Sequence, residues 1–397
     1  MSRQRWVMGL AVVLAVAALG GAARRHLGER ALVVGGEVSA AVTAAPIDAA
    51  ASTNAEASTP PRLAAAASGT QDRLRAPATA ASALAQGMEI CGVGVISEAV
   101  MQRVEAGSAP GQAGPKEIEA QVQRRVDASL ARIAARLAAG TDRQQVAARL
   151  LMQDRDGAAM LAERSSDAQA YQLALTACGA ASADVPHCAR LNPRRWAELD
   201  PSDARPWLRM MEAARRRKDA AGADAALAQA AARPGLSRGS FLLEAQAAAV
   251  ADVIPDADEL GLALVAVIGM DAAMPGIDMG APASACRGDA LRDPVRLGHC
   301  RALARQSLAN ASDLLDATLA QRLAERVGVP REQQAYDAAT LKAAEGRFAE
   351  RATNDVGMGC AALRRIKQLS TKRAASGELA MALALLPPHE PASGPSR

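Results

Sequence analysis

The sequence predicts an all-α fold, and composition is the main reason. Half of the 397 residues are hydrophobic, yet only 2% are aromatic. Alanine accounts for roughly a quarter of the chain, far above ordinary usage. It has the highest intrinsic helix propensity because it loses no side-chain entropy. The β-branched and aromatic residues that favour strands are scarce. We therefore expect antiparallel helical hairpins and one weak strand near residues 91–95.

Periodic apolar residues and capping signals mark the first helices. Gly140 is expected to end the first of them, because glycine commonly closes a helix. Thr141 with Gln144, and Ser166 with Gln169, match the capping box that begins a helix. The apolar residues of the first helix recur every three or four positions, as on one helical face: Ile118, Val122, Val126, Leu130, Ile133 and Leu137.

Two later segments are also predicted to be helical. Asp256 and Glu259 are expected to open a helix whose run Leu260–Ile268 is apolar on all sides. That run is too short to cross a membrane, so it predicts a buried core helix. The second helix ends at Gly328 and Pro330. Its apolar stripe is formed by Leu314, Leu315, Leu319 and Leu323.

Residues 1–34 are predicted to be a membrane anchor or signal segment. Arg3 and Arg5 precede the uncharged apolar run from Trp6 to Ala23, which is at the lower limit for spanning a bilayer. A cleaved export signal is the alternative, with small residues at 21–23 as the cleavage site. The arginines at 24 and 25 would then follow the cut and disfavour processing, so we favour an uncleaved anchor.

The rest of the chain divides by composition into four parts. Residues 35–87 contain Ala, Ser, Thr and Pro with almost no large hydrophobe, which predicts a disordered linker. Residues 88–235 are predicted to form a helical domain, and residues 236–386 a C-terminal helical domain. Residues 387–397 are predicted to be a disordered tail.

The six cysteines predict three disulfides. An even number behind an export-type segment suggests an oxidising compartment. Spacing favours the pairs Cys178–Cys188 and Cys286–Cys300, which leaves Cys91–Cys360. The alternative is a metal site using the adjacent pairs His187-Cys188 and His299-Cys300. The chain lacks the C-x(2–4)-C spacing of compact zinc sites, so we favour disulfides and expect no metal ligand.

One stretch, residues 201–234, resembles the tetratricopeptide repeat. The spacing matches that repeat at seven positions, namely Trp207, Met210, Met211, Ala214, Ala223, Leu227 and Ala230. Asp200-Pro201 and Pro234 lie near the places where such a repeat ends. The segment upstream, from Leu173 to Ala189, keeps the phase only loosely. The resemblance implies a helical hairpin within a repeat array, completed by additional C-terminal helices.

The resemblance also implies a binding surface. In this family the first helix lines the concave groove, which would place Arg205, Leu208, Glu212 and Arg215 on the inner face. Two arginines around a leucine suit an acidic peptide segment or a terminal carboxylate, because a guanidinium forms paired hydrogen bonds to a carboxylate. The alternative is that this face packs against the C-terminal helices.

Other function classes have little support in the sequence. The net charge of +4 is small, and the aromatic residues needed for base stacking are nearly absent, so we expect no nucleic-acid partner. No phosphate-binding loop, nucleophile elbow, zinc-protease or haem motif occurs, and we expect no cofactor or catalytic residue. The acidic residues Asp256, Asp258 and Glu259 are expected to favour a helix N-terminus rather than to catalyse a reaction.

The sequence therefore predicts an exported, membrane-tethered scaffold or protein-interaction module with its folded part in the periplasm. The Ala- and Arg-rich, Lys-poor composition and the export-type segment indicate a bacterial envelope. The expected partners are a protein or an acidic peptide and, through residues 1–34, the membrane. A cleaved, secreted form is the alternative location. The alternative functions are an envelope enzyme with an unrecognised carboxylate site and a metal-binding protein using the two His-Cys pairs.

Overall fold

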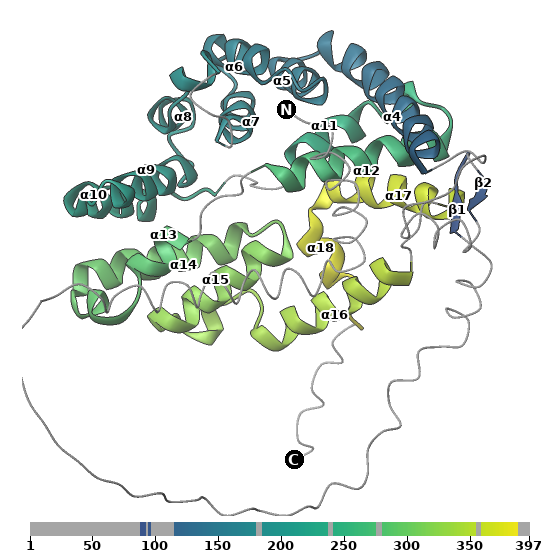
Figure 1. Cartoon of the computed structure of the whole chain (residues 1–397). Helices are drawn as coiled ribbons and strands as arrows, with labels where there is room; N and C mark the ends of the chain where they lie inside the picture. Colours follow the sequence, from purple (N-terminus) through teal and green to yellow (C-terminus); the bar gives the residue numbers. More distant parts are fainter. Residues whose placement is uncertain are drawn as a thin grey trace, which may run out of the picture.

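The computed structural model describes residues 88–92, 94–96, 115–179, 185–236, 241–274, 280–354 and 359–387. The predicted all-α fold is confirmed, because nearly every described segment is helical (Figure 1). The helices are α4 (Pro115–Ala138), α5 (Asp142–Leu151), α6 (Arg155–Arg164), α7 (Ala168–Cys178), α8 (Pro193–Leu199), α9 (Arg205–Arg216), α10 (Ala220–Ala231), α11 (Leu242–Ala249), α12 (Ala257–Ala273), α13 (Gly280–Ala285), α14 (Pro294–Asn310), α15 (Leu314–Val327), α16 (Ala338–Asn354), α17 (Cys360–Ser376) and α18 (Glu378–Leu383).

The helices form an arc with further helices packed below it (Figure 1). Helices α4 to α10 follow the arc in chain order, and α13 to α16 lie beneath its left and central parts. Helix α17 returns from the C-terminal region to pack on α11 and α12, while α14 packs on α10 and α15. Segments far apart in sequence therefore share one folded body.

The strand predicted near residues 91–95 is only partly right, because Cys91 and Gly92 lie in a turn and strands lie on either side of it. β1 (Met88–Ile90) pairs antiparallel with β2 (Gly94–Ile96), and Cys91 and Gly92 begin the turn between them. Gly92 has a φ of +73° and Gly94 a φ of +117°. A backbone in this region strains residues with a β-carbon, which explains the two glycines.

The predictions for the first two helices are confirmed. Along the predicted stripe of α4, five residues are buried, namely Val122, Val126, Leu130, Ile133 and Leu137. Helix α4 ends at Ala138, and the Gly140 amide donates to the Leu137 carbonyl at 3.0 Å. Thr141 and Gln144 form the predicted capping box at the start of α5.

The capping box predicted for Ser166 and Gln169 is wrong by one position. Helix α7 is capped by Asp167, whose carboxylate accepts the backbone N–H groups of Gln169 and Ala170 at 2.7 and 3.1 Å. The Asp167 carboxylate also pairs with Arg143 of α5. A carboxylate that satisfies two helix N–H groups and an arginine is a better cap here than a hydroxyl.

Helix α12 is the buried core helix that its apolar run predicts. Leu260, Leu264 and Val267 have no exposed surface, and Asp256 caps the helix through the N–H groups of Asp258 and Glu259. Gly261 lies against the neighbouring helix α17. A β-carbon at Gly261 would lie 2.2 Å from the Leu363 carbonyl oxygen, so the close approach of the two helices requires glycine.

Helix α15 ends as predicted, but its buried face differs from the predicted stripe. Gly328 adopts the left-handed conformation at its C-terminus, with φ 69°. Leu315, predicted on the apolar stripe, is 44% exposed, whereas Ala317, Ala320 and Ala324 are completely buried. Alanines face the core because small side chains let neighbouring helices approach closely. The predicted stripe contains leucines only and therefore misses this alanine face.

Among the residues that the structure describes, the core consists of three hydrophobic clusters. The first joins residues between 91 and 196 with residues between 243 and 267 and with Leu363. The second joins residues 204–236 with residues between 286 and 329, and the third lies among α15, α16 and α18. Residues from both sides of position 235 thus contribute to the first two clusters, while the division into domains stays a prediction.

Within the described ranges, no helix is both long enough and apolar enough to span a bilayer. The predicted anchor at residues 1–34 and the linker at 35–87 lie outside the described residues, as does the tail after residue 387.

Candidate binding sites

The predicted binding face of α9 is mostly covered by other helices. Arg205 is 2% exposed and Leu208 is 1% exposed, so the structure presents neither side chain to a partner. Glu212 is partly buried, with 20% of its side chain exposed, and lies 3.9 Å from Arg216. Arg215 alone of the four is exposed. For Arg205 and Leu208 the alternative weighed from the sequence holds, because this face packs against the C-terminal helices.

Arg205 is buried by an ion pair to a distant helix. Its Nη2 lies 3.0 Å from Asp316 Oδ2 on α15, and the Asp316 side chain is 19% exposed. Burial raises the pKa of Asp316, the neighbouring Asp313 carboxylate raises it further, and Arg205 opposes both effects. Arg205, which was predicted to bind an acidic partner, thus already pairs with a carboxylate of its own chain.

A different face of α9 is open. We call it the Trp207 groove; it lies between α8, α9 and α10 and has a volume of about 380 Å³. Trp207, Met210 and Pro193 provide apolar surface, and all three are only partly buried. The packing that covers Arg205 and Leu208 leaves Trp207 and Met210 of the same helix partly accessible.

Two arginines lie along the Trp207 groove. Arg194 and Arg217 line it and are exposed, and neither has an ion-pair partner in the part of the chain that the structure describes. Asp219 also lines the groove, but its carboxylate accepts the Gly222 backbone N–H at 2.8 Å and caps α10. Arg233 lies 5.3 Å from the centre of the Trp207 ring, a cation–π distance. The groove therefore combines apolar surface with two guanidinium groups that can donate hydrogen bonds to an anionic partner.

One wall of the groove is fixed by the segment that follows α7. Asn192 caps α8 by accepting the Arg195 backbone N–H, and Pro193 occupies the first turn, where a missing N–H costs nothing. The Asn192 backbone N–H donates to the Tyr171 hydroxyl at 3.0 Å, and burial raises the pKa of that hydroxyl. Trp196 of α8 is 1% exposed and anchors the helix in the core.

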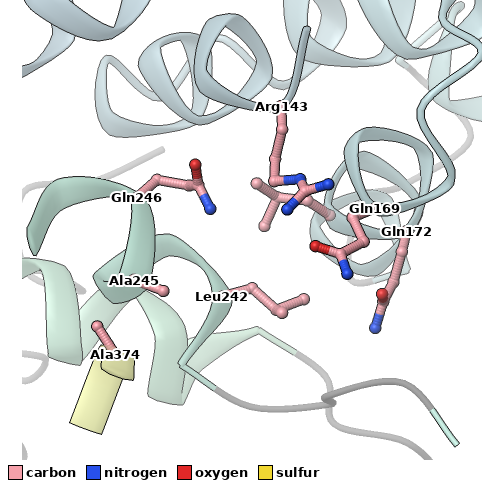
Figure 2. Close-up of a pocket in the computed structure, with 8 residues that line it drawn as sticks. Arg143, Gln169, Gln172, Leu242, Ala245, Gln246 and Ala374 are labelled. Carbon is pink, nitrogen blue, oxygen red and sulfur yellow. The ribbon is translucent and has the colours of Figure 1, made fainter. Parts of the chain in front are cut away.

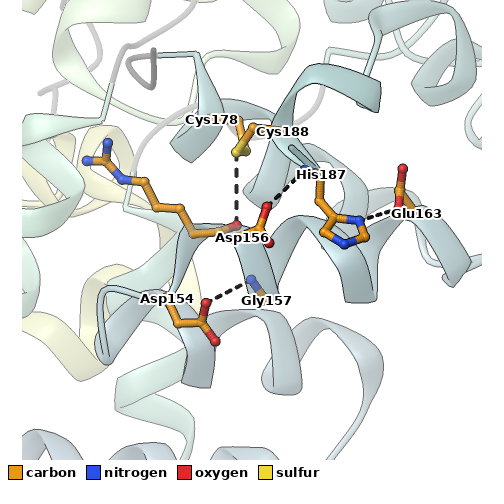
Figure 3. The surroundings of a disulfide bond; sticks show 8 residues. Asp154, Asp156, Gly157, Glu163, Cys178, His187 and Cys188 are labelled. Atoms are coloured by element: carbon orange, nitrogen blue, oxygen red, sulfur yellow. Dashed lines mark hydrogen bonds and ion pairs between the residues drawn. A yellow bond between two sulfur atoms is a disulfide. The ribbon is translucent and has the colours of Figure 1, made fainter. Parts of the chain in front are cut away.

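The same segment is tied to α7 by a disulfide (Figure 3). All six cysteines are paired as predicted, as Cys178–Cys188, Cys286–Cys300 and Cys91–Cys360. Near the Cys178–Cys188 bond, the His187 backbone N–H donates to Asp156 at 2.9 Å, and His187 Nδ1 lies 2.8 Å from Glu163. These contacts hold the chain that leads into α8.

The disulfides remove the two cysteine ligands from the metal-binding alternative. Cys188 and Cys300, the cysteines of the two His-Cys pairs, are both in disulfides, so neither offers a thiolate. Three potential ligands do lie within 4.8 Å of one another in the described part, namely Cys91, Asp258 and Cys360. The two sulfur atoms of that group also form a disulfide.

A second concavity, the polar pocket, lies between α5, α7, α11 and α17 and encloses about 280 Å³ (Figure 2). Polar side chains face this pocket from two sides. Gln246 of α11 lies on one side and Gln169 of α7 on the other. Leu173 and Leu242 supply apolar surface. The other lining residues are Arg143, Gln172, Ala245 and Ala374.

A buried network lies next to the polar pocket. The Asp271 carboxylate of α12 accepts the backbone N–H groups of Leu243 and Glu244 at 3.0 and 2.6 Å. Burial raises the pKa of Asp271 to about 7, although these hydrogen bonds favour the charged form. Arg373 of α17 pairs with Glu244 at 2.9 Å and lies 3.9 Å from Glu378.

The shifted acid of this network lies outside both concavities. A strongly shifted acid in a pocket would favour the enzyme alternative, but Asp271 lines neither the polar pocket nor the Trp207 groove. The pKa values of Asp256 and Glu259 shift in the opposite direction. Hydrogen bonds from backbone N–H groups, that of Glu259 foremost, lower the pKa of Asp256, and hydrogen bonds from Arg132 and Ser129 lower that of Glu259.

Sequence reasoning missed the residues of the polar pocket and the position of Arg194 and Arg217 in the Trp207 groove. The Asn192-Pro193 helix start could have indicated one wall of the groove, but no local pattern brings Gln169 near Gln246. Comparisons with protein-family models, curated proteins and solved structures find no match to this chain. The resemblance to the tetratricopeptide repeat therefore stays a prediction.

Proposed function

We propose that the protein is an exported, membrane-tethered helical-repeat interaction module of the bacterial envelope. In this proposal the Trp207 groove binds an extended, acidic segment of a partner protein. The observation that carries it is the pair of exposed arginines, Arg194 and Arg217, which flank apolar surface and lack ion-pair partners among the described residues.

The groove suits a peptide that combines an acidic residue with a large apolar one. The apolar side chain would cover Trp207 and Met210, since aromatic residues and methionine are enriched at binding surfaces. The acidic residue would pair with Arg194 or Arg217 by the forked hydrogen bonds that a guanidinium makes to a carboxylate. The predicted preference for an acidic partner is thus kept, but with different arginines.

Site-specific photocrosslinking in intact cells tests the groove. A photoreactive residue at Met210 should crosslink a partner protein, whereas the same residue at Val295, which is 63% exposed on α14, should not. The combined substitution Arg194→Glu and Arg217→Glu should abolish the Met210 product. The melting temperature should change little, because exposed substitutions rarely cost more than about 0.5 kcal/mol.

A matched charge reversal controls for the change in net charge. Arg305→Glu with Arg322→Glu removes two exposed arginines that do not line the groove, on α14 and α15. This variant should keep the Met210 crosslink. Equal loss in both variants would mean that general electrostatics, and not the groove, drives the association, and the proposal would be withdrawn.

The location is tested separately. Three disulfides need an oxidising environment to form and persist, which supports a folded part outside the cytoplasm. A reporter enzyme that is active only outside the cytoplasm, fused after Arg397, should be active in cells. A fusion that is active only with a cytoplasmic reporter would contradict the envelope assignment without bearing on the groove.

A further inference from the structure

The polar pocket has hydrogen-bonding capacity that the fold itself does not use. It shares no lining residue with the Trp207 groove and is independent of the function proposed for that groove. Its walls come from α5, α7, α11 and α17, which belong to three separate parts of the chain. Figure 2 shows Arg143 and Gln169 facing the same space as Gln246 and Leu242.

Arg143 forms an ion pair with Asp167, which holds the guanidinium in place and neutralises its charge. Its Nη2 contacts both carboxylate oxygens of Asp167, at 3.2 and 3.1 Å. The same carboxylate accepts the backbone N–H groups of Gln169 and Ala170. Arg143 Nε is buried without a hydrogen-bond acceptor in the structure. Because Asp167 neutralises the guanidinium, the pocket offers donors without a net positive charge.

The glutamines supply both donors and acceptors. The side-chain amides of Gln169 and Gln246 have no hydrogen-bond partner within the described ranges. A carboxamide carries an N–H₂ donor and a carbonyl acceptor, so it can make two hydrogen bonds to one peptide group. Gln169 and Gln246 lie on opposite walls, on α7 and α11, so together they can hold a peptide main chain between them (Figure 2).

We propose that the polar pocket binds a short, uncharged stretch of peptide main chain, with Gln169 and Gln246 as the specificity-determining residues. The volume of about 280 Å³ lies just below the range of roughly 300–1,000 Å³ typical of drug-sized ligands. The size of the pocket therefore suits a small ligand, such as a short stretch of main chain. A ligand with a free carboxylate is disfavoured, because Asp167 already occupies Arg143 and repels a second negative charge.

The test uses the full-length protein labelled with ¹⁵N and three probes. The capped dipeptide N-acetylglycylglycinamide carries only main-chain amides. Its uncapped form, N-acetylglycylglycine, adds a carboxylate, and trehalose offers hydroxyl groups without any amide. Nuclear magnetic resonance follows the side-chain amide signals of Gln169 and Gln246 and the Nε–H signal of Arg143 during each titration up to 50 mM.

We expect saturable shifts of the glutamine signals with the capped dipeptide, weaker binding of the carboxylate form, and no saturable shift with trehalose. In the variant Gln169→Leu with Gln246→Leu, binding read from the Arg143 signal should weaken at least about tenfold, because several hydrogen bonds are lost. Gln368→Leu, at an exposed position of α17, is the matched control and should bind like the original protein.

Three results would overturn the proposal. They are the absence of saturable shifts with the capped dipeptide, trehalose shifts as large as those of the dipeptide, and unchanged affinity in the double variant. The first result needs no substitution, so the proposal stays testable even if the double variant does not fold.

Discussion

Arg205 and Asp316, which are 111 residues apart, form an ion pair of 3.0 Å between α9 and α15. Arg205 is almost completely buried and its Nε lacks an acceptor, so the pair is the main polar contact of this side chain. It links the helical hairpin of α9 and α10 to the C-terminal helices that cover it.

Removing one partner of this pair should destabilise the fold. We expect Arg205→Ala to lower the free energy of unfolding by about 3 kcal/mol, because it leaves the Asp316 charge buried without its partner. Replacing both partners, as Arg205→Met with Asp316→Leu, should restore much of the loss. Arg215→Ala, at an exposed position of the same helix, should cost less than about 1 kcal/mol. Chemical denaturation measures all three, and equal losses for Arg205→Ala and Arg215→Ala would contradict the assignment.

Glycine substitutions should separate helix contact from helix propensity. Gly261→Ala places a β-carbon 2.2 Å from the Leu363 carbonyl oxygen, so α12 and α17 must move apart at a cost of about 1–3 kcal/mol. A β-carbon added at Gly298 of α14 would meet no other atom within 4 Å. Gly298→Ala should therefore stabilise the protein by about 0.5–1 kcal/mol through helix propensity alone. Thermal denaturation should shift in opposite directions for the two variants.

The disulfides should have separable effects on stability and on peptide binding. Cys178 and Cys188 are 10 residues apart, so their bond should contribute about 2–3 kcal/mol, whereas Cys91–Cys360 spans 269 residues and should contribute more. Of the three disulfides, only Cys178–Cys188 lies in the segment leading to Pro193 and Arg194. Its double serine variant should weaken crosslinking at Met210, and the Cys91→Ser, Cys360→Ser variant should not.

Intact-mass analysis checks the premise of that comparison. Protein purified from the envelope should be six hydrogens lighter than the fully reduced chain, since all six cysteines are paired. Six free thiols would refute the disulfides and return the cysteines to the metal-binding alternative.

Asp271 should make stability depend on pH. Its pKa is about 7 in the folded protein and has its ordinary value of 3.8 when burial is lost. The folded state thus holds the proton more tightly, and the resulting stability is fully present below pH 3.8 and lost as the pH rises through 7. Between pH 5.5 and pH 8 the loss should be about 2 kcal/mol. Asp271→Asn cannot titrate and should remove this part of the pH dependence. Identical slopes in both proteins would show that burial does not raise this pKa.

Local sequence predicted the elements that depend on neighbouring residues. The stripe of α4, the capping box at Thr141 and the end of α15 at Gly328 each involve contacts within a few positions. The cap of α7 shows the limit of such reasoning. Ser166 fits the motif, but Asp167 also gains the charge of Arg143, which lies 24 residues away in sequence.

By itself the sequence determined the helical class, the buried character of α12 and the two disulfides between cysteines that are close in the chain, Cys178–Cys188 and Cys286–Cys300. The reason is that helix propensity, apolar periodicity and short chain separations are local properties. Only the tertiary structure decided which face of α9 is covered. Arg205 and Arg217 carry the same positive charge at the two ends of this helix, and their chemistry alone does not distinguish them. The position of Asp316 on α15 buries one guanidinium, and the packing of α8 and α10 leaves the other exposed beside Trp207.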